Sequence, residues 1–512
     1  FMIIAPNRLF LDYISEVLPE LGVENVKQTT FEDLAQEWIG TELKFPDTFE
    51  KLRLIIGDGE TPPPPEQKER IEAIARFKSS LRFKESLDAY IDYVEHHLLP
   101  AEDFAQGRWV VYNQAEIADL FFREYQHWPI LKRLDQLKKH FNKRLKEQKD
   151  AITERMQREC NQRTAIMRQN MPETEERRRR ILSLIDRKDE TIRAAVEFAK
   201  SGAKEYIAKI PIKKPLEYYR EFFTDPRFFL TFASDLEPDF CEAVRESTLA
   251  LMDRKLVDHE DLAPLIYLKS RLHGLGEKVR IKHAVIDEAQ DFSLFQFLML
   301  KSVMKEGSFT ILGDLNQGIH AYRAIERWED VQEKVFGVDH CHLLTLEQCY
   351  RTTVEVMEAA NKVIQKHPEA ALARPVIRHG EPVRIIHKES PKAIAADIAE
   401  KIKELRGEDL RSFAIICKTL RGARSFLKSY PKGEEAPTLI SGKEKAYYGG
   451  IVAVSSYLAK GLEFDAVFIP DADEETYGEE SLDIKLFYVA MTRPLHKLYI
   501  YHAGELTGLL KE

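Results

Sequence analysis

Two adjacent carboxylates, Asp287 and Glu288, are the residues of this 512-residue chain that point most directly to a chemical reaction. They follow the apolar run Ala284–Ile286, which predicts a short buried strand ending at the acid pair. Such a pair is typical of a site that handles metal and phosphate, because one carboxylate can hold Mg²⁺ while the other orients or deprotonates water. The alternative is an acidic dipeptide in a surface loop, and these residues alone do not decide between the two.

A second apolar run, Phe309–Leu312, ends in Gly313–Gln317. The glycine permits a tight turn, and the Gln317 amide is placed to sense a γ-phosphate. Farther along the chain, Arg351 and Arg493 each follow an apolar or aromatic approach. Guanidinium groups bind phosphate oxygens in a fixed geometry, so two of them suit a polyanion held between two lobes. Each feature is weak by itself, but their order and spacing together indicate a nucleotide site.

Five segments as a set resemble the motor motifs of superfamily 1 helicases of the UvrD/Rep/PcrA type. They are Asp287–Asp291 (motif II), Gly313–Gln317 (motif III), Gln348–Thr352 (motif IV), Ser455–Asp465 (motif V) and Tyr488–Arg493 (motif VI). The resemblance covers residues 281–362 and 450–502, together with a short N-terminal piece.

The N-terminal piece Phe1–Phe10 predicts a strand that runs into a loop, and the apolar spacing of Leu11–Leu21 predicts a helix. Gln28–Phe31 resembles the motif Ia region in the variant found in HelD-type proteins. Those proteins are ATPases that bind bacterial RNA polymerase, so the resemblance implies RNA polymerase core as a partner, with DNA as a second possible partner. UvrD itself has a different sequence in this region, so the resemblance favours the HelD type over a general DNA helicase.

The resemblance implies ATP and Mg²⁺ as cofactors and a role for each site residue. Asp287 would hold Mg²⁺, Glu288 would activate water, and Gln317 would link the γ-phosphate to a nucleic-acid face. Arg351 and Arg493 would contact the γ-phosphate, and Tyr350 would stack on adenine. Gly461 would bind the cofactor, and Glu463 would accept a hydrogen bond from a ribose hydroxyl. Tyr322 and Arg323 would contact single-stranded bases. Two alternatives stay open: Tyr350 as an ordinary core residue, and Arg493, which precedes a proline, as a helix cap.

No Gly-x-x-x-x-Gly-Lys-Ser/Thr segment occurs in the sequence. This P-loop cradles the β- and γ-phosphates and supplies a hydroxyl that shares Mg²⁺ with the motif II acid. Because the other motifs are intact, we expect the chain to be the C-terminal part of a longer protein. Its N-terminal segment would carry the P-loop, in the same polypeptide or as a separate one. The 512 residues alone are then expected to be inactive in an ATPase assay.

The predicted fold class is α/β, with two RecA-like parallel-sheet domains of the P-loop NTPase type, the first incomplete, and a large all-helical insertion arm. Residues 1–45 and 271–345 are assigned to the first domain, 46–270 to the insertion and 346–512 to the second domain. Apolar spacing over 129–200, interrupted at Pro172, predicts a helical hairpin at about 129–210.

Finer elements are also predicted. The aromatic-rich segment 216–278 is assigned to a core rather than a stacking surface. Strands are expected at 376–386 and 412–418, with a helix at 397–405 between them.

The formal net charge is −9, yet residues 131–200 contain 20 Lys/Arg and 12 Asp/Glu, so this segment carries +8 and the rest −17. An acidic body with one basic arm favours binding through the arm over a broad nucleic-acid groove. The basic run Arg177–Arg180 is the strongest such spot, and the alternative is a solvated helix face paired with nearby glutamates. Five cysteines without zinc spacing and no run of eighteen apolar residues predict a cytoplasmic protein without a membrane span.

The resemblance to HelD-type proteins therefore implies an ATP-dependent motor that binds bacterial RNA polymerase and remodels or recycles it. Only about 100 residues separate Arg351 from motif V, which leaves little room for the extra domain of UvrD-type helicases and argues against duplex unwinding. A 3′–5′ DNA helicase and a non-enzymatic scaffold that binds polymerase are the alternatives.

Overall fold

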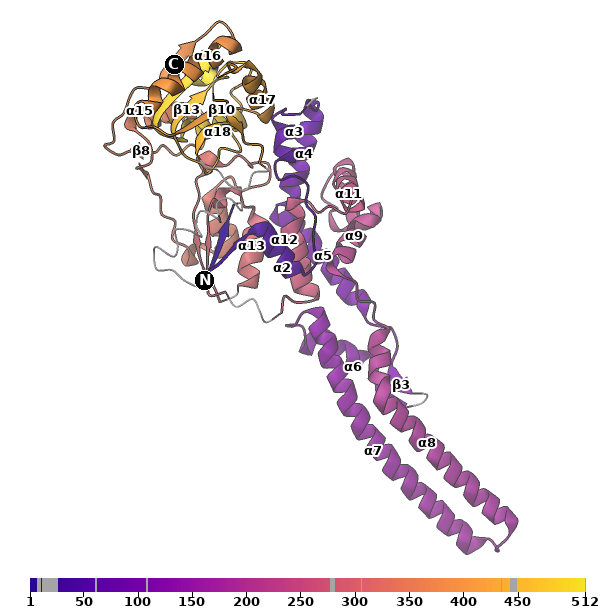
Figure 1. The fold of residues 1–512 in the computed structure, drawn as a ribbon. Coiled ribbons are helices and arrows are strands. Elements are labelled where there is room, and N and C mark those ends of the chain that lie inside the picture. The colour runs from indigo at the N-terminus through magenta and orange to yellow at the C-terminus, as the bar shows by residue number, and fades with distance from the viewer. Residues whose placement is uncertain are drawn as a thin grey trace. The chain divides into compact units, whose positions relative to one another are not determined.

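The computed structural model describes residues 1–6, 11, 26–59, 62–106, 109–276, 281–304, 306–433, 435–442 and 449–511. The chain divides into two compact units: the first comprises residues 1–84, 237–264 and 279–512, and the second residues 85–236 and 265–278 (Figure 1). The loop predicted before Leu11, and nearly all of the helix predicted at Leu11–Leu21, lie outside the described residues.

The first unit contains a parallel sheet of four strands in the order β2-β1-β5-β6. These strands are β1 Met2–Ala5, β2 Lys27–Thr30, β5 His283–Ile286 and β6 Ser308–Ile311. The helices that accompany them are α2 Phe31–Ile39, α13 Leu294–Val303 and α14 Trp328–Val331. Parallel strands place their carboxyl ends at one edge of a sheet, so the loops after β5 and β6 meet there. We call this part of the unit the first lobe.

A second parallel sheet, of six strands in the order β11-β12-β10-β13-β14-β9, forms what we call the second lobe. Its strands are β9 Arg384–His387, β10 Ser412–Cys417, β11 Thr438–Leu439, β12 Gly450–Ser455, β13 Phe464–Ile469 and β14 Pro494–His502. Its helices are α15 Val354–Ile364, α16 Pro391–Arg406, α17 Leu420–Ser429 and α18 Ser481–Met491. A separate two-stranded pair joins β7 Gln348–Cys349 to β8 Arg374–Pro375.

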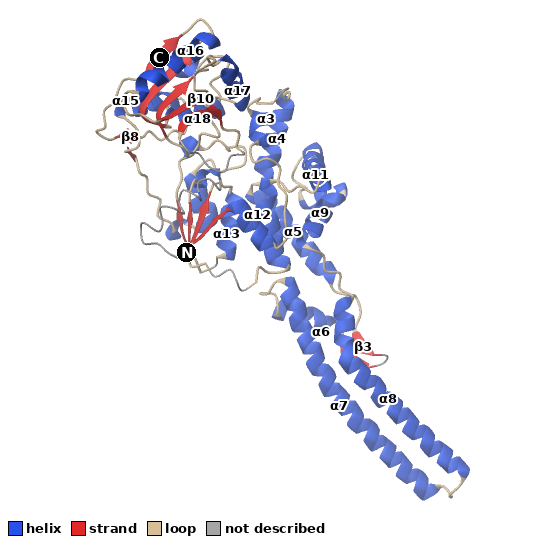
Figure 2. Cartoon of the chain, in the orientation of Figure 1, coloured by secondary structure: helices blue, strands red, loops and turns tan. Residues whose placement is uncertain are grey.

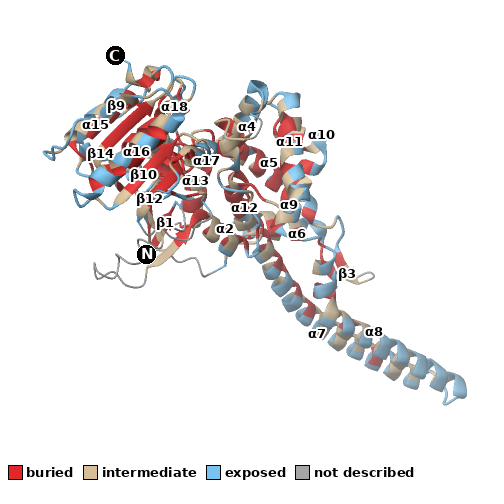
Figure 3. Ribbon diagram, turned by 45° about the horizontal axis from the view of Figure 1, so that its top comes forward, coloured by how far each residue is buried: buried red, intermediate tan, exposed pale blue. Residues whose placement is uncertain are grey.

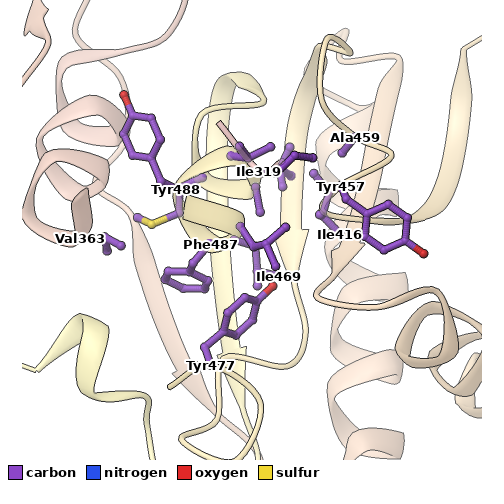
Figure 4. Close-up of a cluster of buried hydrophobic side chains, with 14 of the residues drawn as sticks. Ile319, Val363, Ile416, Tyr457, Ala459, Ile469, Tyr477, Phe487 and Tyr488 are labelled. Atoms are coloured by element: carbon purple, nitrogen blue, oxygen red, sulfur yellow. The ribbon is translucent and has the colours of Figure 1, made fainter. Parts of the chain in front are cut away.

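Strand β10 shows why the second lobe has helices on both faces. Alternate side chains of a strand point to opposite faces of its sheet. Ala414 and Ile416 enter one apolar cluster, whereas Phe413 and Ile415 enter another. The first of these clusters also takes in Ile319, from the segment that follows the first sheet (Figure 4). Both faces of the sheet are therefore buried, as is usual for parallel sheets.

The first unit also contains α3 Glu50–Ile55, α4 Pro65–Lys78, α11 Pro238–Asp253 and the start of α12 His259–Leu272. The division between the two units falls after Pro264, so α12 belongs to both of them.

The second unit is dominated by a long helical hairpin. α7 runs from Ile130 to Asn170 and α8 from Glu175 to Ala208, with Pro172 in the turn, which confirms the predicted helix break. At 1.5 Å per residue, α7 is about 60 Å long. Phe104, Phe141 and Tyr206 form its aromatic packing near the base, with ring centroids 4.5 to 5.4 Å apart. The outer part of the hairpin is mostly exposed (Figure 3).

The rest of the second unit packs around aromatic side chains. Its other helices are α5 Leu81–Leu98, most of which belongs to this unit, α6 Gln114–Asp119, α9 Pro215–Thr224 and α10 Pro226–Phe232. Tyr90, Phe222, Phe223 and Phe229 are fully buried, which confirms that the aromatic-rich segment forms a core. One prediction needs correction. The insertion is not entirely helical, because β3 Phe104–Gln106 pairs antiparallel with β4 Trp109–Tyr112 (Figure 2).

The second lobe contains a half-buried acid, Asp471, with an unusual environment. Asp471 follows β13; its Oδ2 accepts a hydrogen bond from the Lys418 backbone N–H at 3.0 Å, while its Oδ1 has no partner among the described residues. Burial raises the pKa of Asp471 to about 7, with Asp473 adding to the rise and the Lys418 charge opposing it. The buried Cys417 and Tyr477 also face this carboxyl group. The folded state therefore favours the protonated acid.

This environment predicts a pH-dependent stability. A carboxyl group whose folded pKa lies above its unfolded value of about 4 stabilises the fold at low pH, and that contribution is lost as pH rises toward 7. Through this group, we expect the free energy of unfolding to fall by at most roughly 1.4 kcal/mol per pH unit. Asp471→Asn is expected to reduce this pH dependence. Urea unfolding between pH 4 and 7 measures this pH dependence, with Glu475→Gln at an exposed position as control. Equal slopes in Asp471→Asn and the unaltered chain would contradict the assignment.

No helix in the described part of the chain combines the length and apolar character that a membrane crossing requires.

Candidate active site

The acid pair lies at the carboxyl edge of the first sheet. The Asp287 N–H donates to the Ile4 carbonyl of β1 at 3.1 Å, and the Leu312 N–H, just after β6, donates to the Ile286 carbonyl at 2.8 Å. Glu288 then adopts a left-handed backbone conformation with φ of 50°. A non-glycine residue in this region is uncommon and carries strain, which is often stored at functional positions. The predicted strand-then-acids arrangement is therefore present.

A chain of four hydrogen bonds connects Glu288 to the second lobe. The Gln290 side-chain amide donates to Glu288 Oε2 at 2.5 Å, and the Asp314 N–H donates to Gln290 Oε1 at 3.0 Å. The Gln317 amide donates to Asp314 Oδ2 at 2.8 Å, and Arg493 Nη2 donates to Gln317 Oε1 at 2.8 Å. Motifs II, III and VI therefore form one connected polar network.

Gly313 makes this network possible. A Cβ at this position would lie 2.5 Å from Gln290 Oε1 and 2.9 Å from both the Gln290 backbone nitrogen and a ring carbon of Trp328. The Gln290 backbone and the Trp328 ring cannot easily move away. A side chain at residue 313 would therefore displace the Gln290 amide from its position between Glu288 and Asp314. The glycine is required here for close approach and not for a positive φ.

Arg493 is a buried cation whose hydrogen-bond partners in the described part of the chain are carbonyl, amide and hydroxyl oxygens. Its side chain donates to the Val489 carbonyl, Gln317 Oε1 and Thr492 Oγ1, and among the described residues it forms no ion pair with a carboxylate. Burial and the nearby Arg351 charge lower the pKa of Arg493 to about 10, against the opposing effect of Glu288 and Glu463. Arg493 therefore bonds to the end of its own helix, as the helix-cap alternative predicts, and it also reaches Gln317 of the first lobe.

Arg351 and Glu463 form the more open part of the second-lobe side. Arg351 Nε lies 2.6 Å from Glu463 Oε1, and both side chains are about half exposed. Tyr350 is 68% exposed, which excludes a core role in this structure, and its hydroxyl donates to Gln348 Oε1 at 2.7 Å. Gly461 has φ of 82°, so its turn depends on glycine.

Lys460 is a site residue to which the sequence pattern assigned no role. Its Nζ lies 3.2 Å from Glu288 Oε2 and 2.7 Å from Asp291 Oδ2. Burial would raise the pKa of Glu288, but the Lys460 charge, the hydrogen bonds from Gln290 and Lys460, and the Arg493 charge together hold the pKa below its usual range. For Asp291 burial dominates and raises the pKa, and its Oδ1 has no hydrogen-bond partner among the described residues. The sequence could have indicated this role, because Lys460 lies within motif V, directly before Gly461.

Tyr322 and Arg323, predicted to contact bases, are engaged inside the protein. Tyr322 is 4% exposed, belongs to the same apolar cluster as Ile319, and lies 3.2 Å from His320 through its hydroxyl. The Arg323 guanidinium lies 3.8 Å from Glu260 Oε1. Base stacking by Tyr322 would therefore require a rearrangement that exposes its ring.

Three family models match this chain. Residues 66–327, just over half of the chain, match the UvrD/REP helicase N-terminal domain. Residues 344–448 and 450–501 match two models of the UvrD-like helicase C-terminal domain.

Individual relatives agree with these models. The ATP-dependent DNA helicase Rep of Buchnera aphidicola is 25% identical over 213 residues, which cover 40% of this chain and 32% of that protein. An ATP-dependent helicase/nuclease subunit of Alkaliphilus oremlandii is 21% identical over 253 residues, covering 46% of this chain and 21% of that protein. The chain thus spans a third or less of the length of these curated relatives.

Among solved structures, the C-terminal domain of a possible DNA helicase from Lactobacillus plantarum is 26% identical, with a TM-score of 0.27, and covers 32% of this chain and 92% of that domain. The matches to the family models run in the order of the motifs, from the segment before the acid pair to the second lobe. This chain belongs to the UvrD/REP helicase family.

Proposed function

We propose that the chain is the C-terminal portion of an ATP-dependent superfamily 1 motor of the HelD type, which binds bacterial RNA polymerase and remodels or recycles it. The observation that carries the ATPase part is the buried Arg493 guanidinium, which forms no ion pair with any described carboxylate. A buried charge without a counter-ion is costly, so its persistence points to an anionic ligand. The nearby Arg351 adds a second positive charge, which suits a triphosphate better than a single carboxylate.

The acid side of the site fits Mg²⁺ bound together with a nucleotide. No group of three or more His, Cys, Asp or Glu side chains gathers as a metal cage among the described residues. Mg²⁺ is usually held by one or two carboxylates, with phosphate oxygens and water completing its shell. Asp287 provides such a carboxylate at the end of β5, and burial raises its pKa, with Glu288 contributing. The bound metal would neutralise charge that develops on the departing phosphate.

The residues of this chain then have distinct tasks. Glu288, held ionised by Lys460, would accept a proton from the attacking water. Gln317, bonded to Arg493, would report the presence of the γ-phosphate from the first lobe to the second. Arg351 and Arg493 would stabilise the developing charge. Tyr350, Gly461 and Glu463 remain proposed contacts for the base, cofactor and ribose.

The edge of the first sheet indicates where the P-loop segment would add. Among the described residues β6 pairs only with β5, and its side chains alternate between exposed and half-buried. Leu312, Leu344 and Leu346 are 46%, 82% and 91% exposed. Parallel sheets are normally covered on both faces, and an open edge strand is a template for pairing. We therefore place the strand that precedes the P-loop beside β6 in the intact protein.

The helical hairpin of α7 and α8 is the proposed polymerase contact. Each of Arg177 to Arg180 lies within 4 Å of a neighbouring glutamate, so this basic run is largely paired within the helix. Ile166 and Leu182 are 56% and 57% exposed and offer apolar contact area instead. Long exposed hairpins are suited to entering a groove or channel of a partner.

The polymerase part is tested by co-purification. The intact protein is expected to retain RNA polymerase core in a pull-down, and deletion of residues 129–200 is expected to abolish this retention while ATP turnover persists. Retention of polymerase by the deletion variant would exclude the hairpin as the contact.

A 3′–5′ DNA helicase is the second candidate, supported by the DNA helicase name of the Buchnera relative. It predicts DNA-stimulated ATP turnover in the intact protein and a strong loss of that stimulation in Tyr322→Ala. The buried position of Tyr322 argues against this candidate.

A further inference from the structure

One end of α3 is fixed by buried charges at the start of α12. Lys51 Nζ pairs with Asp258 and lies 2.6 Å from Glu260 Oε2. Both carboxylates are almost fully buried, with side chains 5% and 0% exposed. Burial would lower the pKa of Lys51, but Glu260 and Asp258 raise it above its usual range. A buried ion pair of this kind breaks only at a high cost, so α3 and the first turn of α12 should move together.

The same glutamate also faces the segment that follows motif III. Arg323 lies six residues after Gln317, and its guanidinium is 3.8 Å from Glu260 Oε1. That oxygen is buried and has no hydrogen-bond partner among the described residues, although Glu260 Oε2 is bonded to Lys51. The contact is therefore an ion pair with room to tighten, and Glu260 links α3, α12 and the motif III segment.

The other end of α3 is anchored in the second lobe. Asp58, three residues after the helix, accepts hydrogen bonds from the Leu420 N–H at 2.8 Å, the Arg421 N–H at 2.9 Å and the Tyr457 hydroxyl at 2.9 Å. The Arg421 guanidinium returns two bonds, to the carbonyls of Gly59 at 3.0 Å and Gly57 at 3.4 Å. Figure 1 shows α3 next to α17.

Asp58 accepts hydrogen bonds from backbone N–H groups at the start of α17. The first N–H groups of a helix have no partner within it and carry partial positive charge. In α17, Thr419 accepts from the Gly422 N–H, and the two preceding N–H groups, of Leu420 and Arg421, are taken by Asp58. A carboxylate from a segment more than 360 residues away in sequence therefore completes the cap of this helix.

The anchor touches the nucleotide site through motif V. Tyr457, which donates to Asp58, and Lys460, which pairs with Glu288 and Asp291, lie on one short loop after β12. Any shift of this loop during the nucleotide cycle would move the Tyr457 hydroxyl, which donates to Asp58. α3 is therefore linked to the site at both ends, through Glu260 and Arg323 and through Asp58 and Tyr457.

We propose that α3 and the loop Gly57–Gly59 form a coupling strut, which transmits movement of the second lobe during the nucleotide cycle to α12. Because α12 begins in the first unit and continues into the second, the strut delivers that movement to the helical insertion. The inference rests on the proposed nucleotide-driven function and identifies the segment that connects it to the insertion.

Hydrogen exchange of the α12 amides tests the strut in the intact protein, measured with and without a non-hydrolysable Mg-ATP analogue. In the unaltered protein we expect the analogue to change these exchange rates by roughly tenfold. In Asp58→Ala the change is expected to fall below about twofold, while the affinity for the analogue stays within about twofold. Asp58→Asn serves as a second variant, because it keeps the side-chain volume but turns one acceptor into a donor facing a backbone N–H.

Glu50→Gln is the matched control, since it removes one exposed carboxylate from the same helix and should leave the response intact. A full α12 response in both Asp58 variants would overturn the strut. So would a missing response in the unaltered protein, provided that it binds the analogue. The proposed function fails by a different result, namely undiminished ATP turnover in Glu288→Gln, so the two failures are distinguishable.

Discussion

Replacing Glu288 by glutamine is expected to lower ATP turnover of the intact protein by about 10²- to 10⁴-fold, which is the usual contribution of a general base. The variant keeps the shape of the side chain and its position beside Gln290, but it cannot accept a proton. Lys460 retains Asp291 as a partner, so the fold should persist. Steady-state hydrolysis, with nucleotide affinity measured separately, is the appropriate assay, and the loss should appear in kcat with little change in the Kd for ATP.

Glu329→Gln is a suitable control, because Glu329 is a half-exposed glutamate in the same lobe, near Arg327. Unchanged turnover in both variants would show that Glu288 is not the base and would favour the alternative of a non-enzymatic scaffold. A loss of nucleotide affinity that matches the loss of turnover would instead assign Glu288 to binding.

Replacing Arg493 by lysine is expected to lower turnover by about 10³-fold or more, as arginines that neutralise a departing phosphoryl group typically contribute. Lysine keeps the positive charge but loses the planar fork that bonds Gln317 and that, in the proposed mechanism, would face the triphosphate at the same time. It also loses the bond to the Val489 carbonyl, so thermal unfolding must be measured beside activity. The kinetic loss should greatly exceed what any change in folded fraction explains.

Arg384→Lys, at an exposed position on β9 of the same lobe, provides the comparison and should retain nearly full turnover. Near-normal turnover in Arg493→Lys would show that the buried guanidinium serves only to stabilise the end of α18. In that case the absence of a carboxylate partner would have to be explained by the backbone and amide acceptors alone.

The order of the motifs was sufficient to predict which strands lie side by side in the first lobe. Apolar runs that end in acids or in Gly313 predicted adjacent strands, and β5 and β6 do pair in parallel with their ends at one edge. Helix-period spacing interrupted by Pro172 predicted the hairpin. These features are local, so the residue pattern alone determines them.

Two local predictions were wrong in extent. The strand expected at 376–386 exists only at Arg384–His387, because Pro382 lacks an N–H for strand pairing and Gly380 breaks the extended run. The helix expected at 397–405 begins earlier, at Pro391, after Ser390 as its N-cap. Serine followed by proline is a standard helix start, so that signal was present and overlooked.

The contacts that the sequence could not reveal are long-range. Lys460 reaches Glu288 and Asp291 across nearly 170 residues, and Asp58 reaches α17 across more than 360. Neither pairing produces a periodic pattern in the sequence, because each depends on how the two sheets are placed within the first unit. The burial of Tyr322 has the same origin, because its apolar neighbours come from segments far apart in the chain.

The central claim is that acids from the first lobe and guanidinium groups from the second close on one triphosphate. An experimental structure of the intact protein with Mg²⁺ and a non-hydrolysable ATP analogue tests it most directly. We predict the metal on Asp287, and the γ-phosphate within hydrogen-bonding distance of both Gln317 and Arg493. A nucleotide bound elsewhere, with Arg493 still bonded only to Gln317, Thr492 and Val489, would contradict the account.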